Sequence, residues 1–163
     1  MDSKDQKLLD FAKLWLAHDG LWFQAIEQKY GLEAAIELDK EAWGKFSPLE
    51  AKRIMHRLNI KEGGGIPALV RALNERLYAQ LNEQEVIKAD DEHAVFMMKS
   101  CRVQAARRRK NMAPFPCKEV GLAEYSQFAK AIDPRITTKC VTCPPDPYNG
   151  EHWCLWEFSI NGK

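Results

Sequence analysis

The sequence predicts an α+β fold, in which a helical N-terminal half packs with a small antiparallel β-sheet that carries one crossing helix. Apolar side chains recur at helical spacing over the first eighty residues, and the pattern changes to short strand-like runs near residue 84. Helices segregated from an antiparallel sheet define this class. The length suits a single domain, 1–163, with a helical part over 1–82 and a sheet-containing, cysteine-rich part over 83–163.

The first helical region begins at Leu8 and continues to Tyr30. The run His18-Asp19-Gly20 interrupts its apolar pattern, so we expect two helices with a joint between them. Gly31 follows Tyr30 directly, and glycine is typical of the position just after a helix.

Three more helices are expected before the sheet. The first of them covers about 33–43. Ser47-Pro48 marks the start of the next, because serine can cap a helix and proline fits its first turn. After a triple-glycine joint, apolar spacing predicts a long helix over about 66–77.

The second half of the chain alternates strand-like and helical patterns. Two strands are expected at 86–89 and 94–103, around a turn of acidic residues. A helix follows over about 120–132, where Asp133-Pro134 stops it. Two more strands, 135–141 and 152–160, flank a proline-rich loop and complete the predicted sheet.

Charge and hydropathy exclude several classes of partner. Lys and Arg total 24 against 23 Asp and Glu, so no global field attracts nucleic acid or an anionic membrane. The basic run at 107–110 is interpreted as a solvated face. No secretory signal is evident, and no apolar run approaches the ~20 residues of a membrane span. We therefore expect a cytoplasmic protein with reduced thiols; its oligomeric state stays open.

The cysteines are the most informative residues, because all five lie after residue 100. They are Cys101, Cys117, Cys140, Cys143 and Cys154. In a reducing compartment this clustering and the odd count favour metal ligation or thiol chemistry over a disulfide framework. Cys140 and Cys143 form a Cys-x-x-Cys pair at the end of a predicted strand, which is the spacing of a metal-binding turn.

A closed tetrahedral site needs two further ligands besides this pair. Cys117 follows a stiff Pro-Phe-Pro segment, and Cys154 faces Cys143 if the last two strands form a hairpin. Cys101 can join from the neighbouring edge, and His152 can replace a sulfur. Zinc is the expected metal, with an iron–sulfur cluster as the alternative for the same thiolates.

Two other functions stay open. The chain fits a metal-free small-molecule hydrolase or ligand-binding domain, with a pocket between the helices and the sheet lined by Trp22, Trp43 and Trp156. A cysteine would then be the possible nucleophile. The chain also fits an iron–sulfur or thiol redox protein. The sequence therefore leaves open whether the protein is an enzyme.

Two stretches of the chain carry a family resemblance. The first runs from His18-Asp19-Gly20-Leu21-Trp22-Phe23 to Tyr30-Gly31-Leu32-Glu33. The second joins Phe115-Pro116-Cys117-Lys118, Cys140-Val141-Thr142-Cys143-Pro144-Pro145-Asp146 and Cys154-Leu155-Trp156-Glu157-Phe158. Together they resemble a family of uncharacterised bacterial cytosolic proteins.

A more distant resemblance rests on the ending formed by Gly150, Cys154 and Phe158. It is similar to the L-2-amino-thiazoline-4-carboxylic acid hydrolase-like group and to the vinyl-reductase-type small-ligand domains. This resemblance implies hydrolysis of a small ring or binding of a small ligand.

Overall fold

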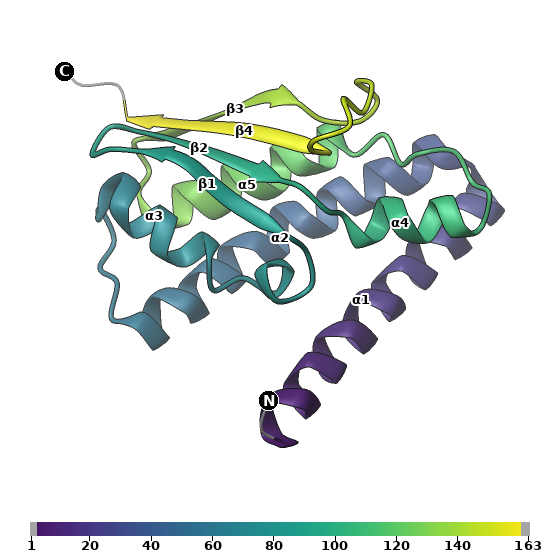
Figure 1. The fold of residues 1–163 in the computed structure, drawn as a ribbon, viewed down its shortest axis with the longest axis horizontal. Coiled ribbons are helices and arrows are strands. Elements are labelled where there is room, and N and C mark those ends of the chain that lie inside the picture. Colours follow the sequence, from purple (N-terminus) through teal and green to yellow (C-terminus); the bar gives the residue numbers. More distant parts are fainter. Residues whose placement is uncertain (1–2, 161–163) are drawn as a thin grey trace.

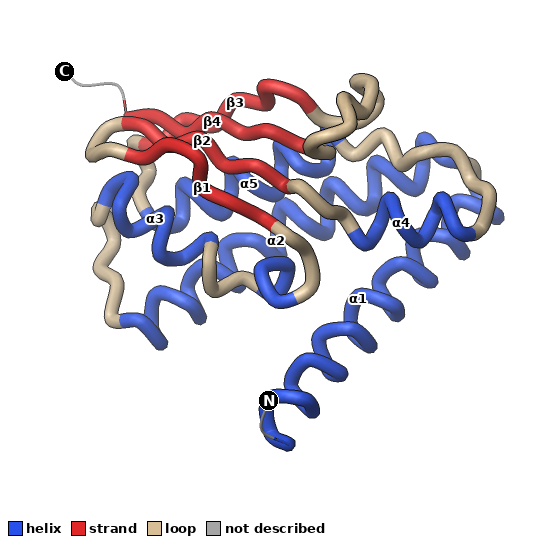
Figure 2. The backbone as a smooth tube through the Cα atoms, in the orientation of Figure 1, coloured by secondary structure: helices blue, strands red, loops and turns tan. Residues whose placement is uncertain are grey.

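A computed structural model describes residues 3–160 and confirms the α+β class (Figure 1). The elements are, in order, α1 (Ser3–Tyr30), α2 (Leu32–Leu58), α3 (Gly65–Leu73), the 3-10 helix η1 (Leu77–Gln80), β1 (Gln84–Ala89), β2 (His93–Met98), α4 (Arg102–Arg109), α5 (Lys118–Ile132), β3 (Ile136–Thr142) and β4 (Cys154–Ile160). The strands form one antiparallel sheet in the order β1-β2-β4-β3. Figure 2 shows this sheet as one layer, with α5 and α2 below it.

The core lies between the sheet and α5. In β2 and β4, alternate side chains are buried, as expected for strands with one covered face. The register places Phe96 opposite Trp156, and the ring centroid of Tyr125 from α5 lies 4.8 Å from that of Trp156. Phe128 and Phe158 are fully buried in the same cluster. Burial of this aromatic surface stabilises the fold.

Two of the helix breaks expected in the N-terminal half are wrong, whereas the breaks at Gly31 and at the triple glycine are confirmed. α1 runs without interruption through His18-Asp19-Gly20, and α2 runs through Ser47-Pro48. The fully buried Ser47 hydroxyl donates to the Trp43 carbonyl oxygen at 2.7 Å, one turn back, and caps no new helix. Proline removes a backbone donor from the interior of α2. Packing of α2 along α5 keeps the helix continuous in spite of that loss.

Smaller differences appear around the sheet. The helix expected at 66–77 ends at Leu73, and η1 follows it as a separate turn. The strand expected at 94–103 ends at Met98, because the chain turns and forms α4 from the basic run. α5, β3 and β4 confirm the expected helix and the last two strands to within about two residues.

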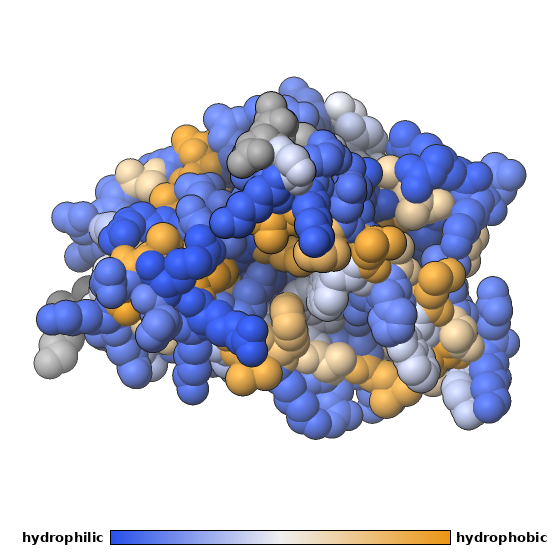
Figure 3. Space-filling view, turned by 90° about the horizontal axis from the view of Figure 1, so that it is seen from below, coloured by the Kyte–Doolittle hydropathy of each residue, from blue (hydrophilic) through white to orange (hydrophobic). Residues whose placement is uncertain are grey.

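α1 differs from the other helices because none of its side chains is buried. Six large apolar residues along it are more than half exposed: Leu8, Phe11, Leu14, Leu21, Trp22 and Tyr30. Figure 3 views the molecule from below and shows a hollow near the centre of this face, with apolar side chains around it. Within residues 3–160, no helix combines the length and the apolar character that a bilayer span requires.

Asp133 joins the end of α5 to the start of α3. Its buried carboxylate accepts hydrogen bonds from the Gly65 backbone N–H at 3.1 Å and from Arg135 Nη2 at 2.6 Å. The Arg135 hydrogen bond is the main reason that the pKa of Asp133 falls from 3.8 to about 2. This carboxylate therefore contributes stability above pH 3.8, and the contribution is lost as the pH falls through about 2.

We expect Asp133→Asn to lower the free energy of unfolding by about 2 kcal/mol at pH 7, as the pKa shift implies. Urea unfolding at pH 7 measures this loss. The exposed Asp5 on α1 offers a matched control, Asp5→Asn, which should leave the urea midpoint unchanged. Equal midpoints for Asp133→Asn and the wild type would show that the carboxylate does not hold the two helices together.

Candidate metal centre and ligand cavity

Three cysteine sulfurs meet where α5, the loop after β3 and the start of β4 converge. Cys143 Sγ lies 3.5 Å from Cys117 Sγ and 3.1 Å from Cys154 Sγ. All three sulfurs lie within 4.8 Å of one another. Around one tetrahedral zinc ion with bonds of about 2.3 Å, sulfurs lie roughly 3.8 Å apart. The three cysteines therefore lie close enough together to bind one metal ion.

Backbone hydrogen bonds fix two of these cysteines. Cys117 is the N-cap residue of α5, and the next residue, Lys118, donates its backbone N–H to the Pro144 carbonyl at 2.9 Å. The loop after β3 folds into a turn, in which Asp146 accepts from the Cys143 N–H at 3.1 Å. Lys118 Nζ also lies 2.6 Å from Asp146. The start of α5 and the Cys143 turn are therefore fastened to each other.

Gln104 on α4 supports Cys117 from the other side, and sequence reasoning missed it. Its side chain is 2% exposed, and it exchanges two hydrogen bonds with the backbone of Phe115, at 2.8 and 3.0 Å. Its Nε2 lies 3.6 Å from Cys117 Sγ. Such outer contacts orient metal-binding residues. No sequence signal separates this glutamine from the basic helix around it.

The remaining sequence candidates lie outside the sulfur trio. Cys140 is in β3, opposite Trp156, and Cys143 lowers the pKa of its thiol. Cys101 is the N-cap residue of α4, and burial raises the pKa of its thiol to about 11. His152 stands beside Asn149 at 3.4 Å.

The protonation of the cysteines is unequal. Hydrogen bonds from Cys143 hold the pKa values of Cys117 and Cys140 below the ordinary range of a thiol. The Cys143 and Cys154 thiols donate hydrogen bonds to Cys117, and these bonds raise their pKa values above that range. Metal binding requires thiolates and releases protons. A divalent cation bound at this cluster would therefore displace protons from the Cys143 and Cys154 thiols.

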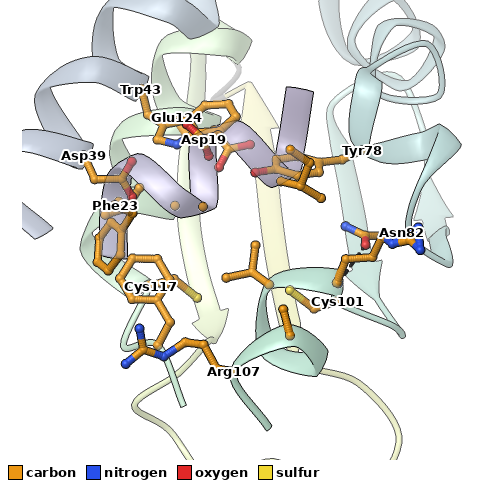
Figure 4. A pocket seen from close by; sticks show the side chains of 18 of the residues that line it. Asp19, Phe23, Asp39, Trp43, Tyr78, Asn82, Cys101, Arg107, Cys117 and Glu124 are labelled. Atoms are coloured by element: carbon orange, nitrogen blue, oxygen red, sulfur yellow. Dashed lines mark hydrogen bonds between the residues drawn. The ribbon is translucent and has the colours of Figure 1, made fainter. Parts of the chain in front are cut away.

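The sulfur trio forms part of the wall of a cavity of about 480 Å³. Figure 4 shows Cys117 among the side chains that line this cavity. Side chains from α1, α2, α4 and α5 surround it, together with Met98 at the end of β2. Trp43 lines the cavity as the sequence indicated. Trp22 does not, because it lies 61% exposed on α1, and Trp156 is buried in the core under the sheet.

The sequence matches the model of a family described as "Family of unknown function (DUF6125)" over residues 2–160. The chain belongs to this family. A search of curated proteins gave no match. The family match agrees with the expected resemblance to an uncharacterised family.

One similar solved structure is the crystal structure of the phenol-responsive sensory domain of the transcription activator PoxR with phenol. Its TM-score is 0.60 at 12% sequence identity, and the match covers 88% of this chain and 73% of that chain. At this identity the likeness shows a shared fold. The neighbour is a sensory domain, whereas the sequence suggested a distant resemblance to a hydrolase-like group.

In this DUF6125 chain, three carboxylates line the cavity. They come from different helices: Asp19 from α1, Asp39 from α2 and Glu124 from α5. Burial raises the pKa of Asp39 to about 7, and repulsion from Asp19 and Glu124 adds to the increase. Burial also raises the pKa of Asp19. Asp19 was interpreted from the sequence as a helix-joint residue, but the continuous α1 carries it into the cavity wall.

Glu124 is held by a buried arginine. Arg76 Nη2 lies 2.7 Å from Glu124 Oε1 and 2.8 Å from Glu50 Oε2, and the Arg76 side chain is 2% exposed. Its guanidinium also stands over the Phe128 ring at 4.7 Å. Burial raises the pKa of Glu124 to about 7 although Arg76 acts against the increase. One guanidinium is therefore shared between two carboxylates.

Arg107 corrects the interpretation of the basic run. It is 5% exposed, and it forms two hydrogen bonds with Glu27 of α1, at 2.7 and 2.9 Å. Its Nε donates to the Ala113 carbonyl at 2.7 Å. Arg108 and Arg109 are exposed, as expected of a solvated face. Arg107 instead joins α4 to α1 at the edge of the cavity.

Proposed function

We propose that this DUF6125 chain is a small-molecule-binding domain in which one zinc ion fastens a wall of the ligand cavity. Cys117, Cys140, Cys143 and Cys154 would hold the ion. The observation that carries this proposal is the position of the three close sulfurs in the wall of the cavity. A metal at that point would tie α5, the proline-rich loop and β4 together beside the ligand.

Cys140 is the best fourth ligand. Cys143 lowers the pKa of its thiol, and the Cys-x-x-Cys spacing suits a turn around one ion. A small side-chain rotation would complete a four-sulfur set, which favours zinc. A closed site of this kind has a structural role. If Cys140 stays outside, the fourth position faces the cavity and would hold water for hydrolysis.

The ligand-binding part of the proposal rests on the cavity. Its volume of about 480 Å³ lies in the range of small-molecule sites, and aromatic side chains such as Phe23, Trp43 and Phe115 line it. The solved neighbour with the same fold is described as phenol-responsive and contains phenol. That neighbour supports a ligand of similar size for this chain.

The metal is tested by purifying the protein without oxygen and quantifying zinc, iron and reactive thiols. We expect about one zinc per chain and one thiol left for alkylation, Cys101, which the four-ligand set leaves out. A brown protein that contains iron would show that the cysteines hold an iron–sulfur cluster and not zinc. Five titratable thiols without metal would refute the metal centre.

The cavity is tested by isothermal titration calorimetry with a set of small aromatic compounds. Ala106 lines the cavity and offers a blocking variant, Ala106→Trp. We expect compounds that bind the wild type to lose binding in this variant while its zinc content is retained. Unchanged binding in Ala106→Trp would place the ligand elsewhere, and the absence of any binding compound would count against a ligand-binding role.

A further inference from the structure

We infer that the cavity selects an organic cation, namely a small protonated amine with an apolar or aromatic body. This inference rests on the proposed ligand-binding function and adds the class of ligand. It follows from the charges inside the cavity, from one carboxylate oxygen without a partner, and from the aromatic walls.

The acidic lining residues of the cavity lie in its interior, whereas most of its basic lining residues lie at the exposed edge. Among residues 3–160, Asp19 and Asp39 form no ion pair with a lysine or arginine, although both line the cavity. Arg76 brings one positive charge to two carboxylates, Glu50 and Glu124. The cavity therefore contains a negative charge that the described part of the chain leaves uncompensated, and burial makes such a charge costly.

Glu124 supplies an independent sign of a missing partner. It is 7% exposed and lines the cavity. Its Oε1 is buried and lies 2.7 Å from Arg76 Nη2, whereas Oε2 keeps some accessible surface and takes part in no hydrogen bond within the described range 3–160. The Glu124 side chain as a whole is 9% exposed, so a donor for this oxygen has to lie inside the cavity that Glu124 lines. An ammonium group carries three donors and a positive charge, so it meets both requirements.

The arrangement favours an organic cation over a metal ion. In the described part of the chain, the three cavity carboxylates form no group close enough to share one ion, whereas the cysteines do. The space between them is bounded by aromatic rings, including Trp43 and Tyr78. Aromatic faces attract organic cations and also cover the apolar body of a ligand. Figure 4 shows Asp19, Asp39 and Glu124 in the same part of the cavity as these rings.

The basic residues around the cavity do not cancel this charge. Arg107 is paired with Glu27. Lys13 is 41% exposed and lies 3.8 Å from Asp10. The others, Arg102, Arg109 and Lys110, are exposed to solvent at the edge, where water and salt screen them. Lys110 also donates to Gln24 at 2.7 Å. The interior thus keeps its acidic character beneath a basic edge.

The inference is tested by calorimetry on the zinc-loaded full chain at pH 7.5 with three compounds of similar shape. These are 2-phenylethylamine, which is protonated at this pH, neutral 2-phenylethanol and anionic phenylacetate. We expect the amine to bind at least about tenfold more tightly than the alcohol, because it makes a charge-assisted hydrogen bond. Phenylacetate should show no binding.

Two carboxylate variants locate the charge that the amine contacts. Asp39→Asn and Asp19→Asn should each weaken amine binding by about tenfold and leave alcohol binding unchanged. The exposed Glu37 on the same helix as Asp39 gives the control Glu37→Gln, which should bind all three compounds as the wild type does. Zinc content and the urea midpoint show that each variant is folded.

The outcomes separate this inference from the proposed function. Equal or tighter binding of the alcohol or of phenylacetate overturns the cation preference, and the ligand-binding role then stands. If none of the three compounds binds, the inference also fails. The aromatic compound set with the Ala106→Trp control decides separately whether the cavity binds ligands at all.

Discussion

Cys143→Ser is expected to abolish zinc binding and to lower the free energy of unfolding by several kcal/mol. Cys143 is the central sulfur, with Cys117 and Cys154 at 3.5 and 3.1 Å, and it is 1% exposed. Structural zinc sites in small peptides contribute roughly 10–16 kcal/mol, so the loss of one ligand affects the whole fold. Zinc per chain and urea unfolding of the variant measure both effects.

Cys101 offers the matched control within the same chain. It lines the same cavity but lies outside the sulfur trio, so Cys101→Ser should keep one zinc and a near-normal unfolding midpoint. A Cys143→Ser protein that retains stoichiometric zinc would contradict the site. Equal loss of zinc in both variants would show that Cys101 is a ligand as well.

The second large effect is expected for Arg76→Met. Arg76 pairs with Glu50 and Glu124 while it is almost completely buried. Removal of the guanidinium leaves two carboxylates without their shared cation, and breaking a buried pair in this way costs about 3–5 kcal/mol. Urea unfolding at pH 7 should therefore show a large loss of stability. Combining Arg76→Met with Glu124→Gln should recover part of it, because one unpaired charge is then removed.

An exposed pair provides the comparison for this prediction. Arg57 Nη1 lies 2.6 Å from Glu75, but the two side chains are 57% and 37% exposed. Arg57→Met should cost less than about 1 kcal/mol, as is usual for surface ion pairs. If Arg76→Met is no more destabilising than Arg57→Met, the buried triad does not stabilise the fold as described.

The sequence predicted the parts of the fold that depend on local pattern. Alternating burial in β4 follows from the run that contains Cys154, Trp156 and Phe158, and α5 follows from its apolar spacing. The clustering of cysteines indicated a shared site, and the structure brings Cys117, Cys143 and Cys154 together. Residue types and spacings of this kind are visible in a single chain.

Features that depend on tertiary contacts could not be predicted in this way. Pro48 is a strong signal for a helix start, yet packing against α5 keeps α2 continuous. Arg107 looks like part of a solvated run until α1 brings Glu27 against it. Asp19 and Asp39 belong to different helices, and only the fold places both in one cavity.

Zinc K-edge X-ray absorption on the anaerobically purified protein tests the central claim most directly. A closed site made by Cys117, Cys140, Cys143 and Cys154 predicts four sulfur neighbours at about 2.3 Å and no lighter ligand. Three sulfurs with one oxygen or nitrogen would contradict the four-cysteine site. A protein that contains no zinc to measure would contradict the metal centre itself.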